Sequence, residues 1–349
     1  MSNTICSSGC GLLQRPAVRI NIVRLRGPQI DTHARSRPLW SQPSRASSWA
    51  ASSSATSFCP STRHIRLADS KSYATASKDT DSRTEARIIS NTREYSPGHN
   101  VATLSISNPS KLNVVNSPLI EELITACREL SKDDALRAVV LTGAPTAAGK
   151  SPSFIGGADI KQMSQMSSFD EAREFISLIH NGCAALRDIP VPVIARVHGF
   201  ALGAGLEIMA SCDLRVATQD SVFGMPEVKI GLPSVIEAAY LPGLIGMGRT
   251  RRFLYLAENI KGPIAEQWGL VERLVTDEAA LDQAVDEWLG TIVGMGPKSI
   301  RSQKKLMQKW ENSTADEAID AGVEALAESF RDGGKEPRGL MGSFLNRKR

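Results

Sequence analysis

The sequence is poor in several features that mark particular classes of protein. Within its 349 residues, no uninterrupted apolar run approaches the roughly 18–20 residues that a membrane-spanning helix needs. The six cysteines form no C-x-x-C pattern and have no histidine partners at metal-ligand spacing. We therefore expect a soluble protein with neither a disulfide framework nor a zinc site. We expect Cys127, Cys183 and Cys212, in the main body of the chain, to be packing residues in a reducing compartment.

Acidic residues are almost absent from the first 73 residues. This segment holds nine arginines and one lysine against two aspartates, whereas the remainder holds 31 basic and 35 acidic side chains. An N-terminal segment rich in arginine and serine and poor in acids is typical of mitochondrial import signals. We therefore predict a mitochondrial presequence over residues 1–73, processed near Tyr73 or Ala74, and a location in the mitochondrial matrix. The alternative is a basic arm that contacts nucleic acid or lipid.

Motifs for nucleotide chemistry are incomplete. The stretch LTGAPTAAGKS follows a strand-like run, but a phosphate-binding loop needs glycine where Ala144 stands, and Gly143 lies one residue too early. The GAG at 203–205 lacks the third glycine of a dinucleotide fingerprint, because that position is Ile208. We therefore expect no nucleotide hydrolysis and interpret residues 144–152 as a flexible surface loop.

The G-x-S-x-G elbow of serine hydrolases is also missing. His198, which directly precedes the glycine-rich turn, therefore has no nucleophile to activate. We expect it to be a packing residue at the end of a strand. Trp268, Trp288 and Trp310 fall in C-terminal helical stretches, and we expect them in the core or in a subunit interface.

Strand and helix patterns alternate through the body of the chain. Strand-like alternation appears in VATLSISN, helical spacing in SPLIEELITACRELSKD with Ser117 as the expected N-cap, and a buried strand in LRAVVLTG. The pattern predicts a helix over 168–189, strands over 191–199 and 213–218, and mostly helices from about 263 onward. This order predicts an α/β architecture.

Three glycines and a carboxylate come together in GFALGAGLEIMASCDLRVA, residues 199–217. Gly203 and Gly205 permit a sharp strand-to-helix turn, and the first amides of a helix lack intrahelical acceptors and lie at its positive end. The Ala204 N–H is therefore free to donate to a developing oxyanion. Glu207 projects from the same helix face three residues later. From spacing alone, a solvent-facing helical glutamate is an equal alternative.

Two further stretches favour a site. The stretch SFIGGADIKQM (153–163) is a second glycine turn that enters a helix, with Ala158 just after the glycines. Two such turns can supply two backbone donors, the usual composition of an oxyanion hole. The stretch SVFGMPEVKIGL places Glu227 after Pro226, with Phe223, Met225 and Val228 around it. A carboxyl in apolar surroundings can serve as an acid near neutral pH.

At these three stretches, and in their order, the sequence resembles the enoyl-CoA hydratase/isomerase (crotonase) superfamily, in particular its mitochondrial hydratase-like branch. The resemblance covers about residues 87–340. It implies a spiral of ββα units with two nearly perpendicular sheets, followed by C-terminal helices that pack in trimers or paired trimers. It also implies a coenzyme A thioester as the substrate. Coenzyme A is then part of the substrate, and we predict no separate cofactor and no metal.

The same resemblance implies roles for particular residues. The amides of Ala158 and Ala204 are implied to form the oxyanion hole for the thioester carbonyl, and Glu207 and Glu227 to be the catalytic carboxylates. We assign Glu207 as the base that activates water and Glu227 as the proton donor to Cα, although a shared role remains open. The residues implied to line the coenzyme A and thioester ends of the substrate are Lys111, Leu112, Ala158, Asp159, Ile160, Lys161 and Ala204.

Both carboxylates are present, which favours hydration. One group must deprotonate water at Cβ, and another must deliver a proton to Cα. We therefore predict an enoyl-CoA hydratase that adds water across the 2,3 double bond of a 2-enoyl-CoA thioester, in fatty-acid or branched-chain amino-acid breakdown. A double-bond isomerase of the same superfamily is the alternative. A crotonase-fold RNA-binding protein is disfavoured, because the body of the chain has more acidic than basic residues.

The sequence departs from the family pattern after Glu227. A glycine-rich segment similar to IPGxGGTQRL is replaced by GLPSVIEAAYLPGLIG, which adds a carboxylate, Glu237. This segment normally shapes the acyl end of the pocket. We expect Glu237 to be a charge on a helix surface, with entry into the pocket as the alternative. In and near the longer 144–152 loop we expect Lys150 and Lys161 to be solvated, with contact to a coenzyme A phosphate as the alternative.

These observations divide the chain into four segments. We predict the presequence over 1–73, a disordered linker over 74–86, a crotonase core domain over 87–275, and a C-terminal helical region for oligomerisation over 276–349.

Overall fold

The computed structural model describes residues 86–346. The expected presequence over 1–73, and the expected linker up to residue 85, lie outside the described residues. Within the described part of the chain, the helices are too short or too polar to cross a membrane.

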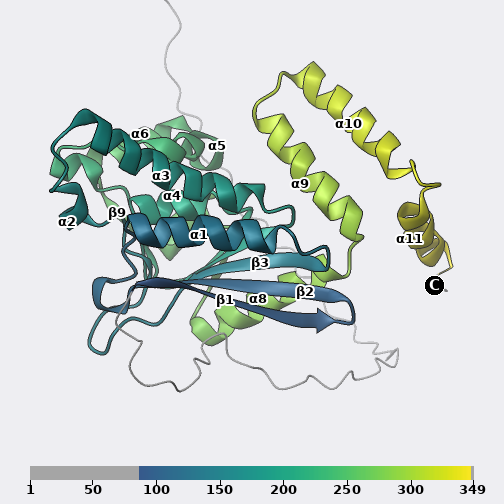
Figure 1. The fold of residues 1–349 in the computed structure, drawn as a ribbon, viewed down its shortest axis with the longest axis horizontal. Helices are drawn as coiled ribbons and strands as arrows, with labels where there is room; N and C mark the ends of the chain where they lie inside the picture. The colour runs from purple at the N-terminus through teal and green to yellow at the C-terminus, as the bar shows by residue number, and fades with distance from the viewer. Residues whose placement is uncertain (1–85, 347–349) are drawn as a thin grey trace, which may run out of the picture. The chain divides into compact units, whose positions relative to one another are not determined.

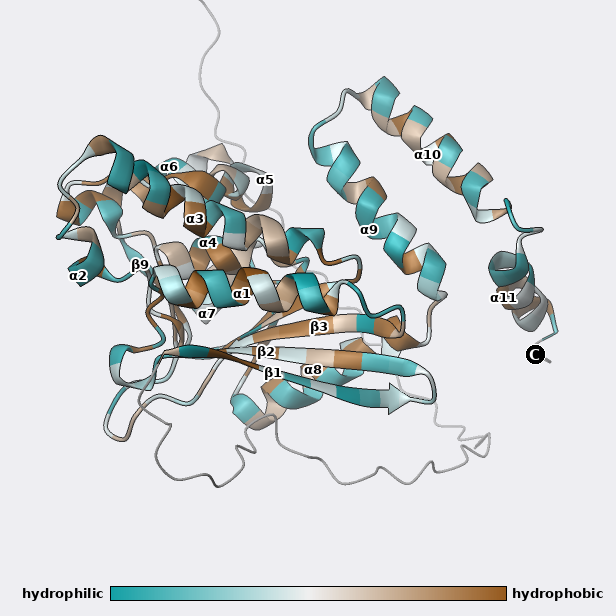
Figure 2. Cartoon of the chain, viewed as in Figure 1, coloured by the Kyte–Doolittle hydropathy of each residue, from teal (hydrophilic) through white to brown (hydrophobic). Residues whose placement is uncertain are grey.

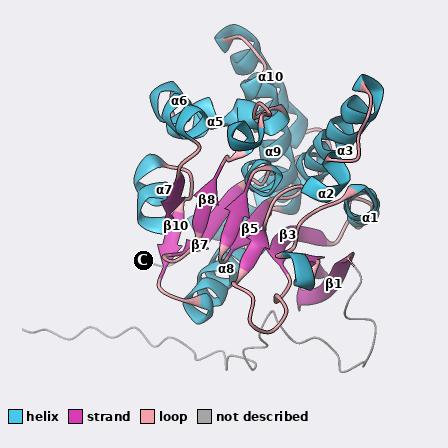
Figure 3. Ribbon diagram, turned by 90° about the vertical axis from the view of Figure 1, so that its left-hand side faces the viewer, coloured by secondary structure: helices cyan, strands magenta, loops and turns pink. Residues whose placement is uncertain are grey.

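Two β-sheets organise the described residues. The larger sheet has the strand order β1-β2-β3-β5-β7-β10 and the smaller has the order β4-β6-β8-β9 (Figure 3). Neighbouring strands are parallel, except in the antiparallel pairs β1–β2 and β8–β9. The strands of the larger sheet are β1 (Arg87–Ser96), β2 (His99–Ser107), β3 (Leu136–Gly143), β5 (Val193–Val197), β7 (Leu214–Thr218) and β10 (Arg273–Val275). Those of the smaller sheet are β4 (Ser153–Ile155), β6 (Phe200–Leu202), β8 (Val222–Gly224) and β9 (Asn259–Lys261).

The chain alternates between the two sheets. Strands β3, β5 and β7 of the larger sheet are each followed along the chain by a strand of the smaller sheet, namely β4, β6 and β8. Helices then follow each pair of strands. After β4 they are α2 (Ile160–Met163) and α3 (Phe169–Asp188), after β6 it is α4 (Ala204–Ala210), and after β8 they are the 3-10 helices η2 (Glu227–Ile230) and η3 (Ile236–Tyr240), then α5 (Leu241–Ile245) and α6 (Met247–Leu256). This succession is the series of ββα units that the resemblance implies.

The larger sheet is covered on both faces. All eight residues of β3 are buried, as its continuous apolar run predicts. Helices α1 (Ser117–Leu130) and α3 lie on one face, and α8 (Glu278–Val293) lies on the other (Figure 1). Alternate residues of β3 therefore enter different cores. Leu141 belongs to the core cluster on the side of α1 and α3, and Val140 belongs to the cluster that contains Leu289 of α8. The apolar strands between these helices are brown in Figure 2.

The C-terminal helices follow α8. They are α9 (Pro297–Glu311), α10 (Ala315–Ser329) and α11 (Lys335–Leu345), and the shorter α7 (Gly262–Trp268) precedes β10. Lys304 of α9 is 4% exposed, and its Nζ donates to Asp213 Oδ2 at 2.8 Å and to the Val191 carbonyl at 3.0 Å. The start of α10 is fixed by a capping box at Thr314. One buried ammonium thus attaches α9 to the loops beside the larger sheet.

The start of α1 differs by one residue from the prediction. The N-cap is Asn116, whose side-chain oxygen accepts the Leu119 N–H at 3.1 Å, and not Ser117. Asn116 has the extended backbone of a cap, whereas Ser117 already belongs to the helix and is followed by Pro118 in the first turn. The strands and helices that the sequence pattern predicts are otherwise found at their expected places, with ends that differ by no more than three residues.

The residues expected to serve in packing are buried. Cys127, Cys183 and Cys212 are buried and unbridged, and burial raises the pKa of Cys127 and of Cys212 to about 12. His198 is 6% exposed, and burial, together with a neighbouring arginine, lowers its pKa, so the ring is neutral. Trp268 is also buried. The packing interpretation of these residues is confirmed.

Candidate active site

Two glycine turns lie side by side at one edge of the smaller sheet. Strands β4 and β6 are parallel neighbours, so the turns that follow them leave the sheet at the same edge. Gly157 and Gly203 have φ values of +117° and +53°, which residues with a Cβ rarely adopt. Gly205 allows close approach, because a Cβ there would lie 2.2 Å from the Ile155 carbonyl oxygen. The glycines therefore bring the two turns into contact.

Each glycine turn is followed by a residue with a free backbone donor. Within residues 86–346, no backbone acceptor is hydrogen-bonded to the amide N–H of Ala158 or of Ala204. Ala158 is held by a parallel bridge to Val115, and Ala204 is the first residue of α4. Because the two turns are adjacent, their free N–H groups are placed as the two donors of an oxyanion hole would be.

Glu207 is buried beside these donors. It lies in the first turn of α4, is 4% exposed, and its Oε1 accepts the Ala238 N–H at 3.4 Å. Burial raises the pKa of Glu207 to about 8, and the negative charges of Glu227 and Glu237 add to the rise. Glu207 is therefore not the solvent-facing glutamate of the alternative interpretation, and it keeps its proton at neutral pH.

Glu227 reaches across the second glycine turn. It follows β8 in η2, and β8 pairs with β6. A Cβ on Gly203 would lie 2.6 Å from Glu227 Oε1, and Oε2 accepts the Ser234 hydroxyl at 2.8 Å. Glu227 is half-buried, and of its predicted apolar neighbours Phe223 and Met225 are buried whereas Val228 is 42% exposed. Glu207 has the more enclosed environment of the two glutamates, since α4 is buried along its whole length whereas η2 is not.

The loop before α1 runs along the first glycine turn. The Leu112 carbonyl accepts the Gly156 N–H at 2.9 Å, and Lys111 Nζ donates to Asp159 Oδ2 at 2.8 Å. Burial alone would raise the pKa of Asp159, but hydrogen bonds from Lys111 and from two backbone amides outweigh it and hold that pKa below its usual value. Lys111, Leu112, Ala158 and Asp159, four of the residues predicted to contact the substrate, are therefore neighbours in space.

Two other residues predicted to contact the substrate are exposed. Ile160 has 60% of its surface in solvent, and Lys161 is also exposed. Lys150, in the 144–152 loop, is exposed as expected. The loop is attached beside Lys111 by a hydrogen bond from the Ala147 N–H to the Pro109 carbonyl. These lysines are thus free to move toward a ligand that would lie along this edge.

Glu237 is not the surface charge that the sequence predicts. It lies in η3 and is 3% exposed, and its Oε1 contacts His180 Nδ1 of α3 at 2.7 Å. The sequence prediction for Glu237 was wrong because η3 packs against both α3 and α4. A contact between segments that are distant in the sequence does not affect the local hydrophobic periodicity. Sequence reasoning also missed Ser234 and Ala238, which hydrogen-bond the two carboxylates, because no motif marks them.

The arrangement defines a class of site. Two free amides and two carboxylates, of which Glu207 has a raised pKa, surround one edge of the smaller sheet. Such a set can stabilise negative charge on a carbonyl oxygen and move a proton at the neighbouring carbons. Groups of three or more metal-ligating side chains are absent from the part of the chain that the structure describes.

Comparison with known proteins gives the family. The model of the enoyl-CoA hydratase/isomerase family matches residues 97–347. Short-chain-enoyl-CoA hydratase of Clostridium acetobutylicum is 33% identical over 250 residues, 71% of this chain and 92% of that protein. Crotonyl-CoA hydratase of Syntrophomonas wolfei is 31% identical over 250 residues, 71% of this chain and 93% of that protein. The chain belongs to the enoyl-CoA hydratase/isomerase family.

Solved structures agree with this membership. The crystal structure of an enoyl-CoA hydratase from Mycobacterium smegmatis has a TM-score of 0.68 and 27% sequence identity, and covers 75% of this chain and 97% of that chain. A Bacillus anthracis enoyl-CoA hydratase has a TM-score of 0.66 and 26% identity, and covers 74% of this chain and 96% of that chain. The predicted crotonase-like α/β fold is confirmed.

Proposed function

We propose that this chain is an enoyl-CoA hydratase that adds water across the 2,3 double bond of a 2-enoyl-CoA thioester. Membership of the family and the names of its relatives support a hydratase-type enzyme. The observation that carries the proposal is that Glu227 reaches Gly203, the residue that begins the turn into Glu207. A single-carboxylate isomerase would not need this second acid beside the oxyanion donors.

The backbone donors supply the electrostatic part of the mechanism. The thioester oxygen accepts hydrogen bonds from the amides of Ala158 and Ala204. These amides stabilise the enolate that forms as water attacks Cβ. Loss of one such donor costs about 3–4 kcal/mol of transition-state stabilisation. Lys111 and the exposed Lys161 lie at the same edge of the sheet and are the candidates for the phosphates of coenzyme A.

The two carboxylates divide the proton transfers. Glu207 holds its proton at neutral pH, which makes it the candidate donor to Cα. Glu227, oriented by the Ser234 hydroxyl, then takes a proton from the attacking water. This division reverses the assignment made from the sequence, because burial acts on Glu207. After one turnover the proton has moved to Glu227, and its return to Glu207 resets the pair.

The first test is the reaction of the full chain with crotonyl-CoA. Hydration removes the absorbance of the conjugated thioester and yields 3-hydroxybutyryl-CoA. Glu227→Gln should reduce the rate by about 10²–10⁴-fold. Glu129→Gln on the exposed surface of α1 is the control and should leave the rate unchanged. A wild-type rate that survives Glu227→Gln would contradict a two-carboxylate hydration.

A double-bond isomerase is the second candidate from the same family. The family description includes isomerases, and a protonated Glu207 can also move a proton along an acyl chain. The two activities differ in their products: a 3-enoyl-CoA would yield the conjugated 2-enoyl-CoA if the chain is an isomerase. Accumulation of that product without a 3-hydroxyacyl-CoA would favour the isomerase. Comparison of straight and branched 2-enoyl-CoA substrates would then separate fatty-acid from branched-chain amino-acid breakdown.

We also propose that the enzyme acts in the mitochondrial matrix after residues 1–73 are removed. The support is compositional: this segment is rich in arginine and serine and nearly free of acids. Residues 1–73 fused to a fluorescent protein should enter mitochondria and be cleaved. A fusion that stays in the cytosol would contradict the proposal.

We propose a trimer or a pair of trimers as the assembly. Helix α10 supports self-association, because Ile319, Val323 and Leu326 are 65%, 61% and 67% exposed and recur at helical spacing. Light scattering coupled to size-exclusion chromatography should give a particle mass that is a multiple of the 37.6 kDa chain mass. If the presequence is removed, the mass should be a multiple of that of the shortened chain. A monomer would contradict this assembly.

A further inference from the structure

Glu237 is a buried carboxylate with one unsatisfied oxygen. Its side chain is 2% exposed, its Oε1 is 2.7 Å from His180 Nδ1, and its Oε2 has no hydrogen-bond partner among the described residues. An unsatisfied charged group inside a protein is costly, and such groups are few in native structures. Packing gives no reason to keep a charge here, because an apolar side chain of the same size would fill the space.

The backbone beside Glu237 holds the catalytic carboxylate. The next residue, Ala238, donates its N–H to Glu207 Oε1 at 3.4 Å, and this hydrogen bond by itself favours the charged form of Glu207 and lowers its pKa. The charge of Glu237 also acts on Glu207, in the same direction as the charge of Glu227. The buried Cys183 of α3 is affected by the charges of both Glu237 and Glu207, so both carboxylates act within the same enclosed part of the core, where charges interact strongly. A negative charge at Glu237 therefore disfavours a second one at Glu207.

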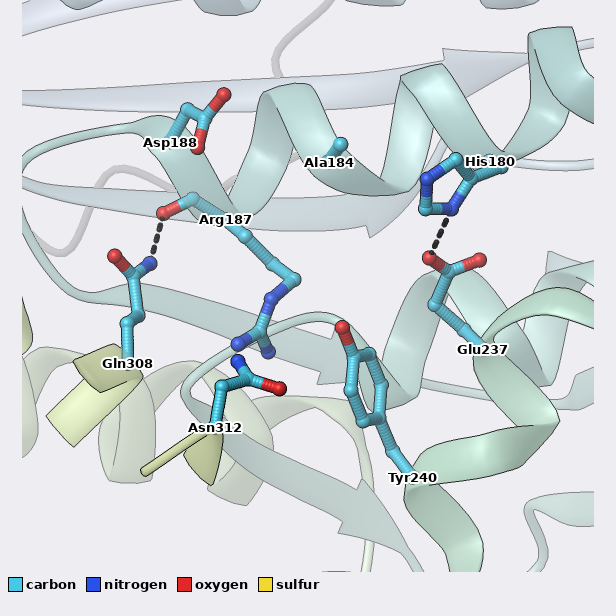
Figure 4. Close-up of a pocket in the computed structure, with 8 residues that line it drawn as sticks. All are labelled: His180, Ala184, Arg187, Asp188, Glu237, Tyr240, Gln308 and Asn312. Carbon is cyan, nitrogen blue, oxygen red and sulfur yellow. Dashed lines mark hydrogen bonds and ion pairs between the residues drawn. The ribbon is translucent and has the colours of Figure 1, made fainter. Parts of the chain in front are cut away.

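In the contact between Glu237 and His180, the His180 side chain is open to solvent. The His180 side chain is 53% exposed, and it lines a cavity of about 220 Å³ with Arg187, Tyr240 and Gln308 (Figure 4). In this view Glu237 and His180 face each other across the gap between η3 and α3, and Arg187 lies over the Tyr240 ring, 4.6 Å from its centre. Glu237 also lines this cavity beside the imidazole, whereas Glu207 is buried and does not line it.

We propose that Glu237, anchored by His180, is a positioning residue that keeps Glu207 protonated until that proton is donated to Cα. The inference rests on the proposed function, in which Glu207 is the proton donor. The groups that face Glu237 are His180 and Cys183 from α3 and Glu207 from α4, with Tyr240 on its own element and Glu227 beyond Glu207. Of these, only Glu207 is both buried and aligned with the oxyanion donors.

The test is the pH dependence of kcat/KM for crotonyl-CoA in the full chain. Glu237→Gln removes the charge and keeps the shape, so the alkaline fall in rate should move to lower pH by roughly 0.5–1 pH unit. At pH 6 the rate should remain within about twofold of wild type, and at pH 8 it should fall several-fold. A loss of rate that is equal at every pH would show a merely structural role and would overturn the proposal.

His180→Gln is the matched variant. It removes the imidazole from the same contact but leaves the Glu237 charge, so the alkaline midpoint should stay in place or rise. If it falls as far as in Glu237→Gln, loss of the contact and not of the charge is responsible, and the proposal is overturned. Glu237→Met, of similar volume and uncharged, serves if Glu237→Gln does not fold, and the same downward movement is expected.

A measurement without turnover separates this inference from the proposed function. The infrared band of a protonated carboxyl that disappears in Glu207→Gln reports the proton on Glu207 directly. In wild type this band should persist through neutral pH, and in Glu237→Gln it should titrate at lower pH. If the chain does not hydrate crotonyl-CoA but the band moves, the proposed function fails and the coupling stands. A band that does not move overturns the coupling, whatever the activity.

Discussion

Glu207 and Glu227 are of one residue type in one site, yet the fold gives them different surroundings. Glu207 is enclosed within α4 and is held by the Ala238 amide, whereas Glu227 lies in a partly exposed 3-10 turn and is held by the Ser234 hydroxyl. Burial favours the neutral form of a carboxyl. In the proposed mechanism, this difference in environment makes Glu207 the proton donor.

The first prediction concerns the direction of the pH profile. If protonated Glu207 is the donor, kcat/KM for crotonyl-CoA falls as pH rises through about 8, where the group loses its proton. A rate that instead rises through this range would identify Glu207 as the base, as the sequence alone suggested. Because the two carboxylates interact, the midpoint belongs to the pair, and comparison with Glu227→Gln shows how far each contributes.

The second prediction concerns stability. The pKa of Glu207 is raised from 4.5 to about 8 on folding, so between these values the unfolded chain has lost a proton that the folded chain keeps. Stability due to this group is therefore complete below about pH 4.5 and falls as pH rises to about 8. Glu207→Gln has no carboxyl group at this position, so its stability does not fall with pH on account of this residue.

The variant should thus match wild type near pH 4.5 and be more stable by as much as about 4 kcal/mol at pH 8.5. Urea unfolding at both pH values measures the difference. An advantage of Glu207→Gln that is equal at both pH values would contradict the raised pKa.

At the scale of elements, the site depends on how closely β4 and α4 approach. Gly205 of α4 faces the carbonyl of Ile155 at the end of β4, and this contact brings the turns that carry Ala158 and Ala204 close together. Packing of this kind tolerates no added methyl group, because a carbonyl in a paired strand cannot move aside.

The third prediction follows from this contact. Gly205→Ala places a Cβ 2.2 Å from the Ile155 carbonyl oxygen and should destabilise the fold by about 3 kcal/mol. It should also lower kcat, because the Ala204 N–H is displaced. Gly243→Ala in α5 is the control, since a Cβ there meets nothing within 4 Å, and its stability should equal or exceed that of wild type. Thermal unfolding of both variants measures this, and equal melting temperatures would contradict the argument.

The elements also show how far sequence reasoning reaches. Strand β3 and helix α3 lie where their apolar patterns predict, because the local spacing of apolar residues indicates whether one or both faces are buried. The 3-10 turn η3 has no such pattern. Its residue Glu237 is buried by α3 and α4, which are distant in sequence, so local spacing gave the wrong environment.

At the scale of the whole molecule, a buried ion pair is among the contacts that attach the C-terminal helix α9 to the rest of the chain. Lys304 of α9 is buried, and its ammonium is paired with Asp213, which also accepts the Val193 N–H at 2.7 Å. Removing one partner of a buried pair leaves an uncompensated charge, which is more destabilising than the pair itself is stabilising.

The fourth prediction uses this pair. Lys304→Met keeps the aliphatic stem but removes the charge, and should destabilise the chain by about 3 kcal/mol. The same substitution should be less destabilising in a chain that already carries Asp213→Asn, because the partner charge is then absent. Chemical denaturation of the two single variants and the double variant measures the coupling. Fully additive effects would mean that the ion pair does not attach α9. Lys305→Met, next in the sequence and exposed, is the control and should change stability by less than about 0.5 kcal/mol.

The sequence by itself determined the family, the ββα order, the two glycine turns and the identity of the two acids, because each depends on residue type and local spacing. Tertiary structure alone decided that Glu207 is buried and its pKa raised, that Ser234 and Ala238 hydrogen-bond the two acids, and that Glu237 is enclosed near Glu207. A pKa depends on the solvent and charges that surround a group in three dimensions. Those surroundings are assembled from α3, α4, η2 and η3, which meet only when the chain has folded.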